Sequence, residues 1–480
     1  MTGARSQKWR MNYWLLALAL IGLVIARLGL LLQDISQRIP KKSLHAERCT
    51  RHLSIMSPED IVPVFAGVFL ASSGEMRRFF MKAFGAARTP MGHIYAIWDV
   101  DDPSKDPSVA PLVLEGFPEN TAFHPHGLHY RRETGELFVV NHAYTMGGER
   151  IDVFKVEQTF AQEPLPEVHP SLREDGPSQA GAGAAPVEKE DKSQGAAVVA
   201  EGLLDGAAPV KIRYSFSVDH EIITSSYGVL NDLVLVSDDE LYVTQSMTLR
   251  FPSGGPIHAV NLMEALRGGA SWLLLQTRLA RPPIIRCTRI RSEDIQCRRL
   301  AYGYGIMYNG IAVSPDKKRL LVSDSMDMKM LVFNRSLETG ALSLHQRIPL
   351  PAAPDNLELD PHRAAAGEEA YTVGLVNPWD YMKYTQVAKG SKDPEVAETL
   401  VMGGGGSSLT YDRESGTYSN SLEMWCDDSP YSVSSVAATP SGARLFGSSV
   451  TRGFKLCRAP PCDSSDRDSS ETCGWTPPVA

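Results

Sequence analysis

The sequence has no long run of lysine and arginine beyond its N-terminus, where Arg5, Lys8 and Arg10 lie. Acidic residues outnumber basic ones by 56 to 48, so the formal net charge is -8 and the pI is about 5.9. Nucleic-acid binding needs a clustered positive surface. The charge pattern therefore gives no support for a nucleic-acid-binding protein.

Helical periodicity is also scarce in this chain. Short alternating apolar runs take its place, for example residues 93–98 and 151–156, and turn residues separate them. Runs of this length and period are typical of β-strands. The pattern predicts an all-β domain.

Long hydrophobic runs are rare, and the one that stands out is residues 13–32, interrupted by Arg27. It is long enough to span a bilayer. A cleaved signal peptide would have a shorter core and a small-residue cleavage site. We therefore expect an uncleaved signal anchor, which with a polar stalk makes up residues 1–40. Basic residues on both sides of the run leave its orientation open.

Three segments lack the apolar and aromatic residues that a packed structure needs. Residues 160–210 are rich in Ala, Gly, Glu, Pro and Ser and predict a disordered insertion between strands. Gly403 to Gly406 predict a flexible loop, and residues 459–480 predict a flexible tail.

Cysteine is infrequent, with seven residues in 480. Cys49 precedes the first expected strand and Cys457 follows the last, so a bridge between them would clasp the two ends of a ring. Closing so long a loop contributes roughly 4–5 kcal/mol in the chain-entropy model. Such a bridge makes sense in an oxidising compartment.

The other cysteines allow two local pairs, Cys287 with Cys297 and Cys462 with Cys473, which leaves Cys426 as a buried free thiol. Asn334-Arg335-Ser336 is a glycosylation sequon on an expected turn. Both features predict that the folded domain lies in the secretory lumen or outside the cell.

A repeated module dominates the rest of the chain: a polar residue, an alternating apolar strand, a tight turn and a second apolar strand. Four copies begin at His126, Asn231, Asn309 and Asp355, and residues 433–446 form a weaker fifth. Repetition at this scale is typical of a β-propeller, in which each sheet packs on the next. We expect one large propeller over residues 45–458.

The first strand of each propeller blade lines the central channel, so polar residues that start these strands should meet around one axis. They are His126, Asn231, Asn309, Asp355 and Asn356. Amide oxygens with a carboxylate form a suitable cage for Ca²⁺, which takes six to eight oxygen ligands. The alternative is that Asn and Asp before a strand only serve the turn.

The order of several short motifs carries a family resemblance. The motifs are Cys49, Ser57-Pro58-Glu59-Asp60, Pro125-His126-Gly127, Val139-Val140-Asn141-His142, Leu230-Asn231-Asp232, Asn309-Gly310-Ile311, Ser314-Pro315-Asp316, Asp355-Asn356 and Cys457. Together they resemble the paraoxonase/arylesterase family over residues 45–460, apart from the insertion. The resemblance implies a six-bladed propeller with two calcium ions in its central tunnel.

The resemblance also implies the ligands of each ion. A catalytic Ca²⁺ would be held by Glu59, Asn231, Asn309, Asp355 and Asn356. A second, structural Ca²⁺ would be held by Asp60, Asp232 and the carbonyl oxygen of Leu128. Because the second ion binds only the native ring, its loss should destabilise the fold.

The implied reaction is the hydrolysis of aryl esters and lactones, and in some members of phosphotriesters. Ca²⁺ would polarise the carbonyl or phosphoryl oxygen. His126, supported by His142, would activate water, and histidine suits this task at neutral pH. Asp355 is a rival base or nucleophile, and His142 has an alternative reading as a buried structural histidine.

Two other functions fit the same pattern. One is a propeller hydrolase similar to the gluconolactonase and strictosidine synthase-like groups. The other is a membrane-anchored propeller that acts as a scaffold or chaperone without catalysis. The leading expectation is a membrane-anchored, calcium-dependent ester hydrolase whose partners are a small ester or lactone and, through residues 13–32, a membrane.

Overall fold

In the computed structural model the chain divides into two compact units, Met1–Lys41 and Lys42–Ala480. The structure describes residues 36–74, 91–143, 148–159, 167–173, 208–220, 223, 229–247, 282–300, 304–390, 400–427, 432–439 and 441–458, with residues 22, 26, 29 and 33. Across these ranges, no helix is long and apolar enough to cross a membrane. The anchor expected at residues 13–32 lies almost wholly outside them, as does the tail at 459–480.

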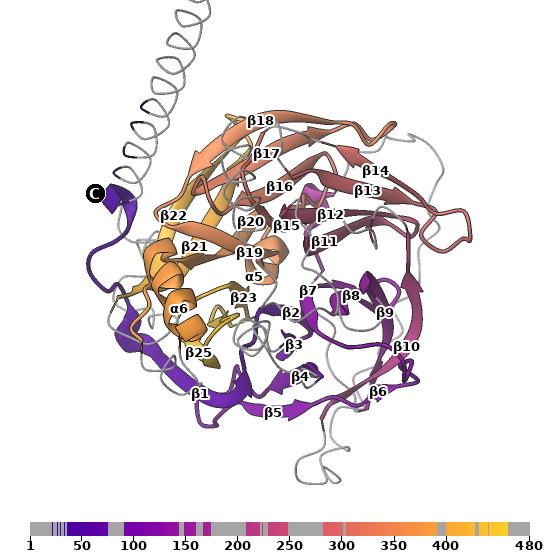
Figure 1. Cartoon of the computed structure of the whole chain (residues 1–480), viewed down its shortest axis with the longest axis horizontal. Coiled ribbons are helices and arrows are strands. Elements are labelled where there is room, and N and C mark those ends of the chain that lie inside the picture. The colour runs from indigo at the N-terminus through magenta and orange to yellow at the C-terminus, as the bar shows by residue number, and fades with distance from the viewer. Residues whose placement is uncertain are drawn as a thin grey trace, which may run out of the picture. The chain divides into compact units, whose positions relative to one another are not determined.

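The second unit is a six-bladed β-propeller (Figure 1). Blade 1 consists of β2 (Asp60–Phe65), β3 (Val68–Ser73), β4 (His93–Trp98) and β5 (Ser108–Pro111). Blade 2 consists of β7 (Pro125–Arg131), β8 (Glu136–Ala143), β9 (Gly148–Gln158) and β10 (Val210–Val218), with β6 (Leu114–Glu115) parallel to β10. Blade 3 consists of β11 (Val229–Ser237), β12 (Glu240–Met247), β13 (Ile284–Thr288) and β14 (Gln296–Leu300).

The remaining three blades follow the same plan. Blade 4 consists of β15 (Tyr308–Val313), β16 (Arg319–Asp324), β17 (Lys329–Arg335) and β18 (Leu342–Pro349). Blade 5 consists of β19 (Ala353–Leu359), β20 (Ala370–Val376), β21 (Gly404–Asp412) and β22 (Thr417–Cys426). Blade 6 consists of β23 (Ser435–Ala438), β24 (Arg444–Gly447), β25 (Arg452–Cys457) and β1 (Cys49–Met56). The six-bladed fold expected from the sequence is confirmed.

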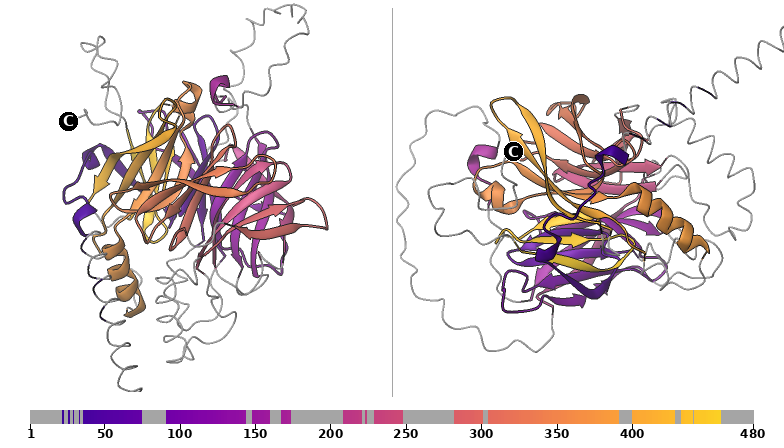
Figure 2. Two further views of the ribbon diagram at one scale, coloured as in Figure 1. Left: turned by 90° about the horizontal axis from the view of Figure 1, so that it is seen from above. Right: turned by 90° about the vertical axis from the view of Figure 1, so that its left-hand side faces the viewer.

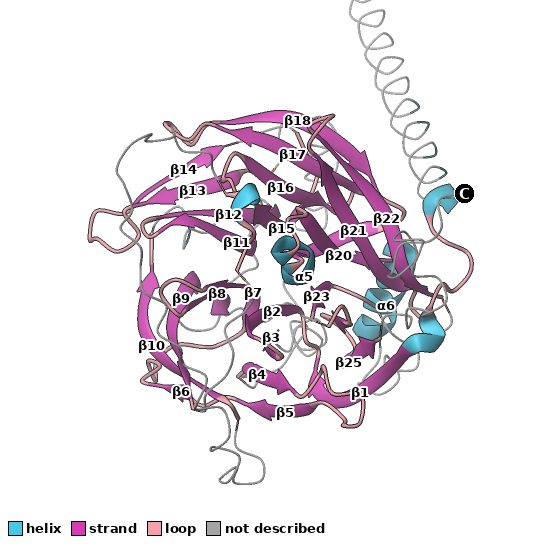
Figure 3. Ribbon diagram, turned by 180° about the vertical axis from the view of Figure 1, so that it is seen from behind, coloured by secondary structure: helices cyan, strands magenta, loops and turns pink. Residues whose placement is uncertain are grey.

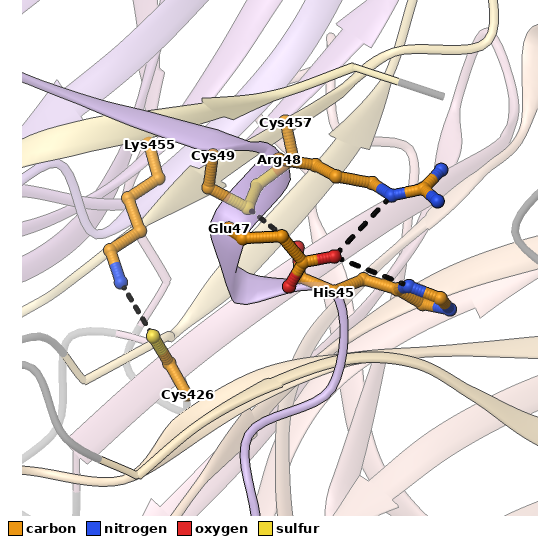
Figure 4. The surroundings of a disulfide bond; sticks show 7 residues. All are labelled: His45, Glu47, Arg48, Cys49, Cys426, Lys455 and Cys457. Atoms are coloured by element: carbon orange, nitrogen blue, oxygen red, sulfur yellow. Dashed lines mark hydrogen bonds and ion pairs between the residues drawn. A yellow bond between two sulfur atoms is a disulfide. The ribbon is translucent and has the colours of Figure 1, made fainter. Parts of the chain in front are cut away.

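The first strand of the chain closes the ring. β1 pairs antiparallel with β25, and Cys49 lies opposite Cys457 in the register. A disulfide joins these two residues, and a second one joins Cys287 to Cys297 across β13 and β14. Both expected pairs are therefore confirmed, while Cys462 and Cys473 lie outside the described residues. Cys426 is buried outside any disulfide and accepts a 3.0 Å hydrogen bond from Lys455 Nζ (Figure 4).

The inner strands form a closed circle of contacts, in the order β2, β7, β11, β15, β19, β23 and back to β2. Each repeat copy found in the sequence forms the first two strands of a blade, and residues 433–446 supply the hairpin of β23 and β24. Apolar side chains of neighbouring sheets share the core clusters between the blades. Leu70 of blade 1 packs in one cluster with Leu137 of blade 2. The core therefore lies between the blades and leaves the axis to polar side chains.

Two helices follow strands of blade 5. α5 (Pro361–Ala365) follows β19 and lies near the centre of the ring (Figure 3), whereas α6 (Pro378–Gly390) follows β20. Because β19 and β20 are antiparallel, the helices emerge on opposite faces of the propeller (Figure 2). The inner strands begin on the face of α6, since β19 runs from that face toward α5.

Some expectations for the loops were wrong. Gly404–Asp412 is the buried strand β21, so Gly403 to Gly406 do not form a flexible loop. A Cβ atom at Gly405 would lie 2.0 Å from the Met424 carbonyl oxygen, so these glycines serve close strand packing. Within the expected insertion, Glu167–Arg173 contain a 3₁₀ turn (Pro170–Leu172) whose His169 N–H bonds Ala364 O of α5 at 3.0 Å. Residues 160–166 and 174–207 lie outside the described residues.

Helix α6 was not expected, although its start carries a recognisable signal. Asn377 precedes Pro378, and its Oδ1 accepts a 3.1 Å hydrogen bond from Trp379 N–H. An Asn cap followed by Pro in the first helical turn is a common way to begin a helix. Tyr384 anchors the helix, since its hydroxyl donates to Val450 O at 3.2 Å.

Candidate functional site

The polar residues predicted from the repeats gather at the starts of the inner strands. Each pair stands at the same point of its blade, either within the first four residues of the strand or directly before it. The pairs are Glu59-Asp60, His126-Gly127, Asn231-Asp232, Asn309-Gly310, Asp355-Asn356 and Ser434-Ser435. Because these strands form a closed circle, the pairs face one axis. We call this set the hub.

Glycine in two of these pairs allows the inner strands to approach closely. A Cβ atom on Gly127 would lie 2.5 Å from the carbonyl oxygen of Asn231. A Cβ atom on Gly310 would lie 2.6 Å from the Asp355 carbonyl oxygen. The His-Gly and Asn-Gly motifs therefore serve geometry as well as chemistry, since a larger residue would push neighbouring blades apart.

Direct contacts join the hub residues of different blades. Asn356 Nδ2 donates to Glu59 Oε1 at 3.0 Å. Glu59 Oε2 lies 3.3 Å from His126 Nδ1. His126 Nε2 lies in turn 3.2 Å from Asn231 Nδ2. A hydrogen bond between Asn309 and Asp355 adds blade 4 to this series. Residues from five blades thus form one connected site.

Five buried oxygen atoms in this site have no hydrogen-bond partner among the described residues. They are Glu59 Oε2, Asn231 Oδ1, Asn309 Oδ1, Asp355 Oδ1 and Asn356 Oδ1. Buried polar atoms almost always have a partner, because an unmet oxygen loses its hydration. These five residues are the ones that the sequence predicted as ligands of the catalytic Ca²⁺. Hard cations bind carboxylate and amide oxygens, so this donor set fits a calcium ion.

The second predicted set has a different character. Asp60 Oδ2 accepts a 2.7 Å hydrogen bond from the N–H of Leu128, and Asp232 Oδ2 accepts a 2.9 Å bond from the N–H of Ile311. Each carboxylate thereby joins its own blade to the next. The structure brings Leu128 and Asp60 together, although through the Leu128 N–H rather than the predicted carbonyl. A carboxylate oxygen has more than one lone pair, so these hydrogen bonds leave room for a cation.

Repulsion and burial act together on the hub carboxylates. Burial, and then the charge of Asp355, raise the pKa of Glu59 well above its usual range. Burial raises the pKa of Asp60 to about 7, against hydrogen bonds from Leu128 and Ile61 that lower it. Burial and then Asp60 raise the pKa of Asp355 to about 8. The hub therefore holds its negative charge at a cost.

Glu358, on β19, was missed by the sequence analysis and belongs to the same group. Burial raises its pKa well above the usual range, and the charges of Asp60 and Asp232 add to this effect. Burial and Asp60 likewise raise the pKa of Asp232. Glu358 follows Asn356 by two residues on one strand, so alternation places both side chains on the axial face. That spacing is the signal that sequence reasoning could have used.

Tyr381 of α6 was also missed. Burial raises the pKa of its hydroxyl, and the charges of Asp355, Tyr384 and Glu59 raise it further. The hydroxyl therefore lies close enough to sense two hub carboxylates. It comes from the helix on the face where the inner strands begin, so it borders the site on that face.

The predicted histidine pair is present. The ring centroids of His126 and His142 are 4.7 Å apart with an interplanar angle of 44°. Burial, and then the charge of His142, lower the pKa of His126 well below its usual range. His126 is therefore neutral at neutral pH and able to accept a proton. Asp355 faces the same site, so the structure brings both candidate bases together.

No group of three or more His, Cys, Asp or Glu side chains in the described part of the chain is arranged to hold a metal ion. The first candidate set accordingly depends on its three asparagines. Away from the hub, Asn334 of the glycosylation sequon lies on strand β17 and not on the expected turn, and its side chain is exposed. Glycosylation of this exposed side chain stays a prediction.

Fold and hub together define a six-bladed β-propeller with a carboxylate-rich and amide-rich axis. No family model matches the chain, and no curated protein matches it. Among solved structures it is similar to a luciferin-regenerating enzyme, with 10% identity, a TM-score of 0.39, and coverage of 87% of this chain and 96% of that one. It is similar to a streptogramin B lyase, with 11% identity, a TM-score of 0.39, and coverage of 85% and 97%. A putative 6-phosphogluconolactonase from Bacteroides uniformis shares 11% identity with a TM-score of 0.34, covering 76% and 84%. At these values the likenesses carry no information on ligand or reaction.

Proposed function

We propose that this protein is a calcium-dependent hydrolase of carboxylic esters, with aryl esters and lactones as the substrate class. The observation that carries the proposal is a set of five buried oxygens without a hydrogen-bond partner among the described residues, on Glu59, Asn231, Asn309, Asp355 and Asn356. The resemblance of the motif order to the paraoxonase/arylesterase family supports the same activity and extends it to phosphotriesters. No Lys or Arg of the described residues pairs with a hub carboxylate, so an external cation is the natural counter-charge.

Calcium bound by the five residues would polarise the carbonyl oxygen of an ester. The chain's own part is to hold the proton acceptor beside that position. His126, neutral and 3.3 Å from Glu59, would take a proton from water, and His142 would support the resulting charge. Asp355 is the second candidate for this role. Asp60 and Asp232, the two carboxylates that the resemblance assigns to a structural ion, would contribute to a second cation site that stabilises the ring.

The two disulfides suggest where the enzyme works. Structural disulfides persist in the secretory pathway and outside the cell. We infer that the propeller is a lumenal or extracellular domain, anchored to the membrane by residues 13–32. The exposed Asn334 sequon agrees with that location.

The test combines hydrolysis and metal binding. Phenyl acetate and a panel of lactones are assayed with the purified protein in the presence of calcium, after chelation, and after calcium is restored. We expect activity that chelation abolishes and calcium restores. Calcium binding by titration calorimetry and melting temperature are measured on the same samples.

Two variants locate the activity. Asn309→Ala should remove hydrolysis and weaken calcium binding while the fold persists. Asn420→Ala is the matched control, because Asn420 donates only to Pro349 O on the surface and should leave both unchanged. Calcium binding with a rise in melting temperature but no hydrolysis would favour the scaffold alternative. Absence of calcium binding would contradict the proposal.

A further inference from the structure

A buried carboxylate stands behind the histidine pair. Both oxygens of Glu149 lie within hydrogen-bond distance of His142 Nδ1, Oε1 at 3.0 Å and Oε2 at 3.1 Å. His142 is 2% exposed and Glu149 is 5% exposed. The two residues are direct cross-strand partners on β8 and β9. Their contact is therefore built into the register of blade 2.

Glu149 has no other charged partner among the described residues. Its neighbour Arg150 binds Asp152 Oδ1 at 2.8 Å and the hydroxyl of Tyr214 at 3.1 Å, so Arg150 serves the other side of the strand. A carboxylate buried this deeply costs free energy unless a donor satisfies it. Among the described residues the His142 ring is the donor to Glu149, which makes a purely space-filling role unsatisfactory.

The contact fixes the state of the His142 ring. An ionised carboxylate only accepts hydrogen bonds, so Nδ1 of His142 must carry the proton. A partner on Nδ1 also sets the orientation of the ring, as in other carboxylate-histidine pairs. The ring of His126 lies 4.7 Å from this oriented ring and contacts Glu59 and Asn231 on its own far side. An unbroken series of contacts thus runs from Glu149 to the candidate metal ligands.

We propose that Glu149 is a positioning residue: it orients His142 and, through that ring, holds His126 against the hub. The catalytic consequence rests on the proposed ester hydrolysis, whereas the orientation itself does not. On this assignment the histidine pair, rather than Asp355, is the proton acceptor that the fold supports. Charge on His142 formed during proton transfer would be balanced by Glu149.

The experiment uses the full chain with calcium and the variants Glu149→Ala and Glu149→Gln. Nitrogen-15 NMR of the imidazoles reports whether Nδ1 of His142 carries a hydrogen-bonded proton. We expect its downfield proton signal in the wild type and its loss in Glu149→Ala. The turnover number should fall about 10- to 100-fold, the range for losing a group that orients a functional histidine, with KM and calcium affinity unchanged.

Glu149→Gln keeps an acceptor for Nδ1 but removes the charge, so the signal should persist while turnover falls by a smaller factor. Glu157→Gln, on the exposed part of the same strand, is the control and should change neither quantity. An unchanged His142 signal and unchanged turnover in Glu149→Ala would overturn the assignment. If the wild type hydrolyses no ester, the proposed function fails, but the orientation of His142 is still tested by NMR. Loss of the Nδ1 proton signal in Glu149→Ala would then support that orientation. Persistence of the signal would overturn it.

Discussion

The hub and the ion pairs between neighbouring blades, which we call the rim, both hold carboxylates with little exposure, but they balance them differently. On the rim, the partner is an arginine from the chain itself. Glu369 binds Arg319 at 2.7 Å, Glu240 binds Arg335 at 3.1 Å, and Glu423 binds Arg444 at 3.0 Å. Each of these pairs joins neighbouring blades. At the hub, no Lys or Arg of the described residues forms an ion pair with Glu59, Asp60, Asp232, Asp355 or Glu358.

Two rim carboxylates, Glu136 and Glu240, differ from the hub in the direction of their pKa shifts, whereas burial raises the pKa of Glu369 even beside Arg319. At the rim, burial opposes ionisation of Glu136, yet hydrogen bonds and charge from Arg291 prevail and lower its pKa to about 2. At the hub, burial dominates and the pKa of Asp355 rises to about 8. The rim is electrostatically complete without a ligand. On the proposed function, a bound cation would supply the counter-charge that the hub lacks.

The largest effect should come from removing a rim cation. Arg444 is 4% exposed and contacts Glu423 and also Asp360, at 2.9 Å. Arg444→Met would leave two buried carboxylates without a cationic partner, although Asp360 keeps its hydrogen bonds from the N–H groups of His362 and Arg363. Breaking a buried pair in this way costs about 3–5 kcal/mol. Urea unfolding should show this loss equally with calcium and with chelator.

The matched control is Arg213→Met, which breaks an ion pair with Glu157 on the outer strands of blade 2, where the Arg213 side chain is 58% exposed. Exposed pairs contribute about 1 kcal/mol or less. A loss in Arg444→Met that calcium restores would mean that rim and hub are coupled, contrary to the division drawn here.

Calcium should produce the next largest effect, and only at the hub. Binding to the native state alone adds about 2.7 kcal/mol of stability at a concentration 100 times the Kd. The pKa values of Asp60 and Asp355, about 7 and about 8, lie above the unfolded value of 3.8. Their favourable contribution in chelator is therefore present below about pH 4 and lost as pH rises through 7 to 8. The calcium increment should be largest at alkaline pH.

Asp355→Asn sharpens this comparison because its effect should change sign. In chelator at pH 8 the variant should be at least as stable as the wild type, since a buried charge without a counter-ion is gone. With calcium it should be less stable, since a ligand is gone. The equivalent change at the rim, Glu240→Gln, should destabilise under both conditions, because, against burial, Arg286 and Arg335 lower the pKa of Glu240. Melting curves of the two variants with calcium and with chelator test this difference. If calcium changed the effect of both substitutions in the same way, the distinction between hub and rim would be wrong.

Part of the hub could be predicted from the repeat, because its polar residues occupy one repeated position, whereas Glu59 and Asp60 were indicated only by the family resemblance. Every inner strand starts with a polar pair, and the second member alternates between Asp60, Gly127, Asp232, Gly310 and Asn356 around the ring. The glycines make room and the acidic residues bond the next blade, so the repeat encodes the geometry. The alternating strands and the two cysteines at the ends of the domain then predicted a closed propeller.

The rim and the supporting residues could not be found in this way. Glu149 contacts His142 because of the register between β8 and β9. Glu369 forms its ion pair with Arg319 of the neighbouring blade. Nothing in the local sequence marks these partners. For Gly403 to Gly406 the local sequence indicated the wrong structure. A glycine run is typical of a flexible loop, but here the glycines allow a strand to pack closely against its neighbours. Such choices are decided by long-range packing.

The smallest effect concerns how much a rim carboxylate contributes to the free energy of unfolding at low pH. Glu136 keeps its charge to about pH 2, below the ordinary value of 4.5, so its contribution is present above pH 4.5 and lost as pH falls toward 2. Arg291 is 35% exposed, so solvent screening limits the contribution to about 1 kcal/mol. Glu136→Gln should therefore unfold more easily by that amount at pH 6, and the difference should vanish near pH 2. Glu133→Gln, an exposed carboxylate beside Arg131, should show no such pH-dependent difference. If chelated protein instead lost stability from Glu136→Gln mainly above pH 7, the rim carboxylate would be behaving like those of the hub.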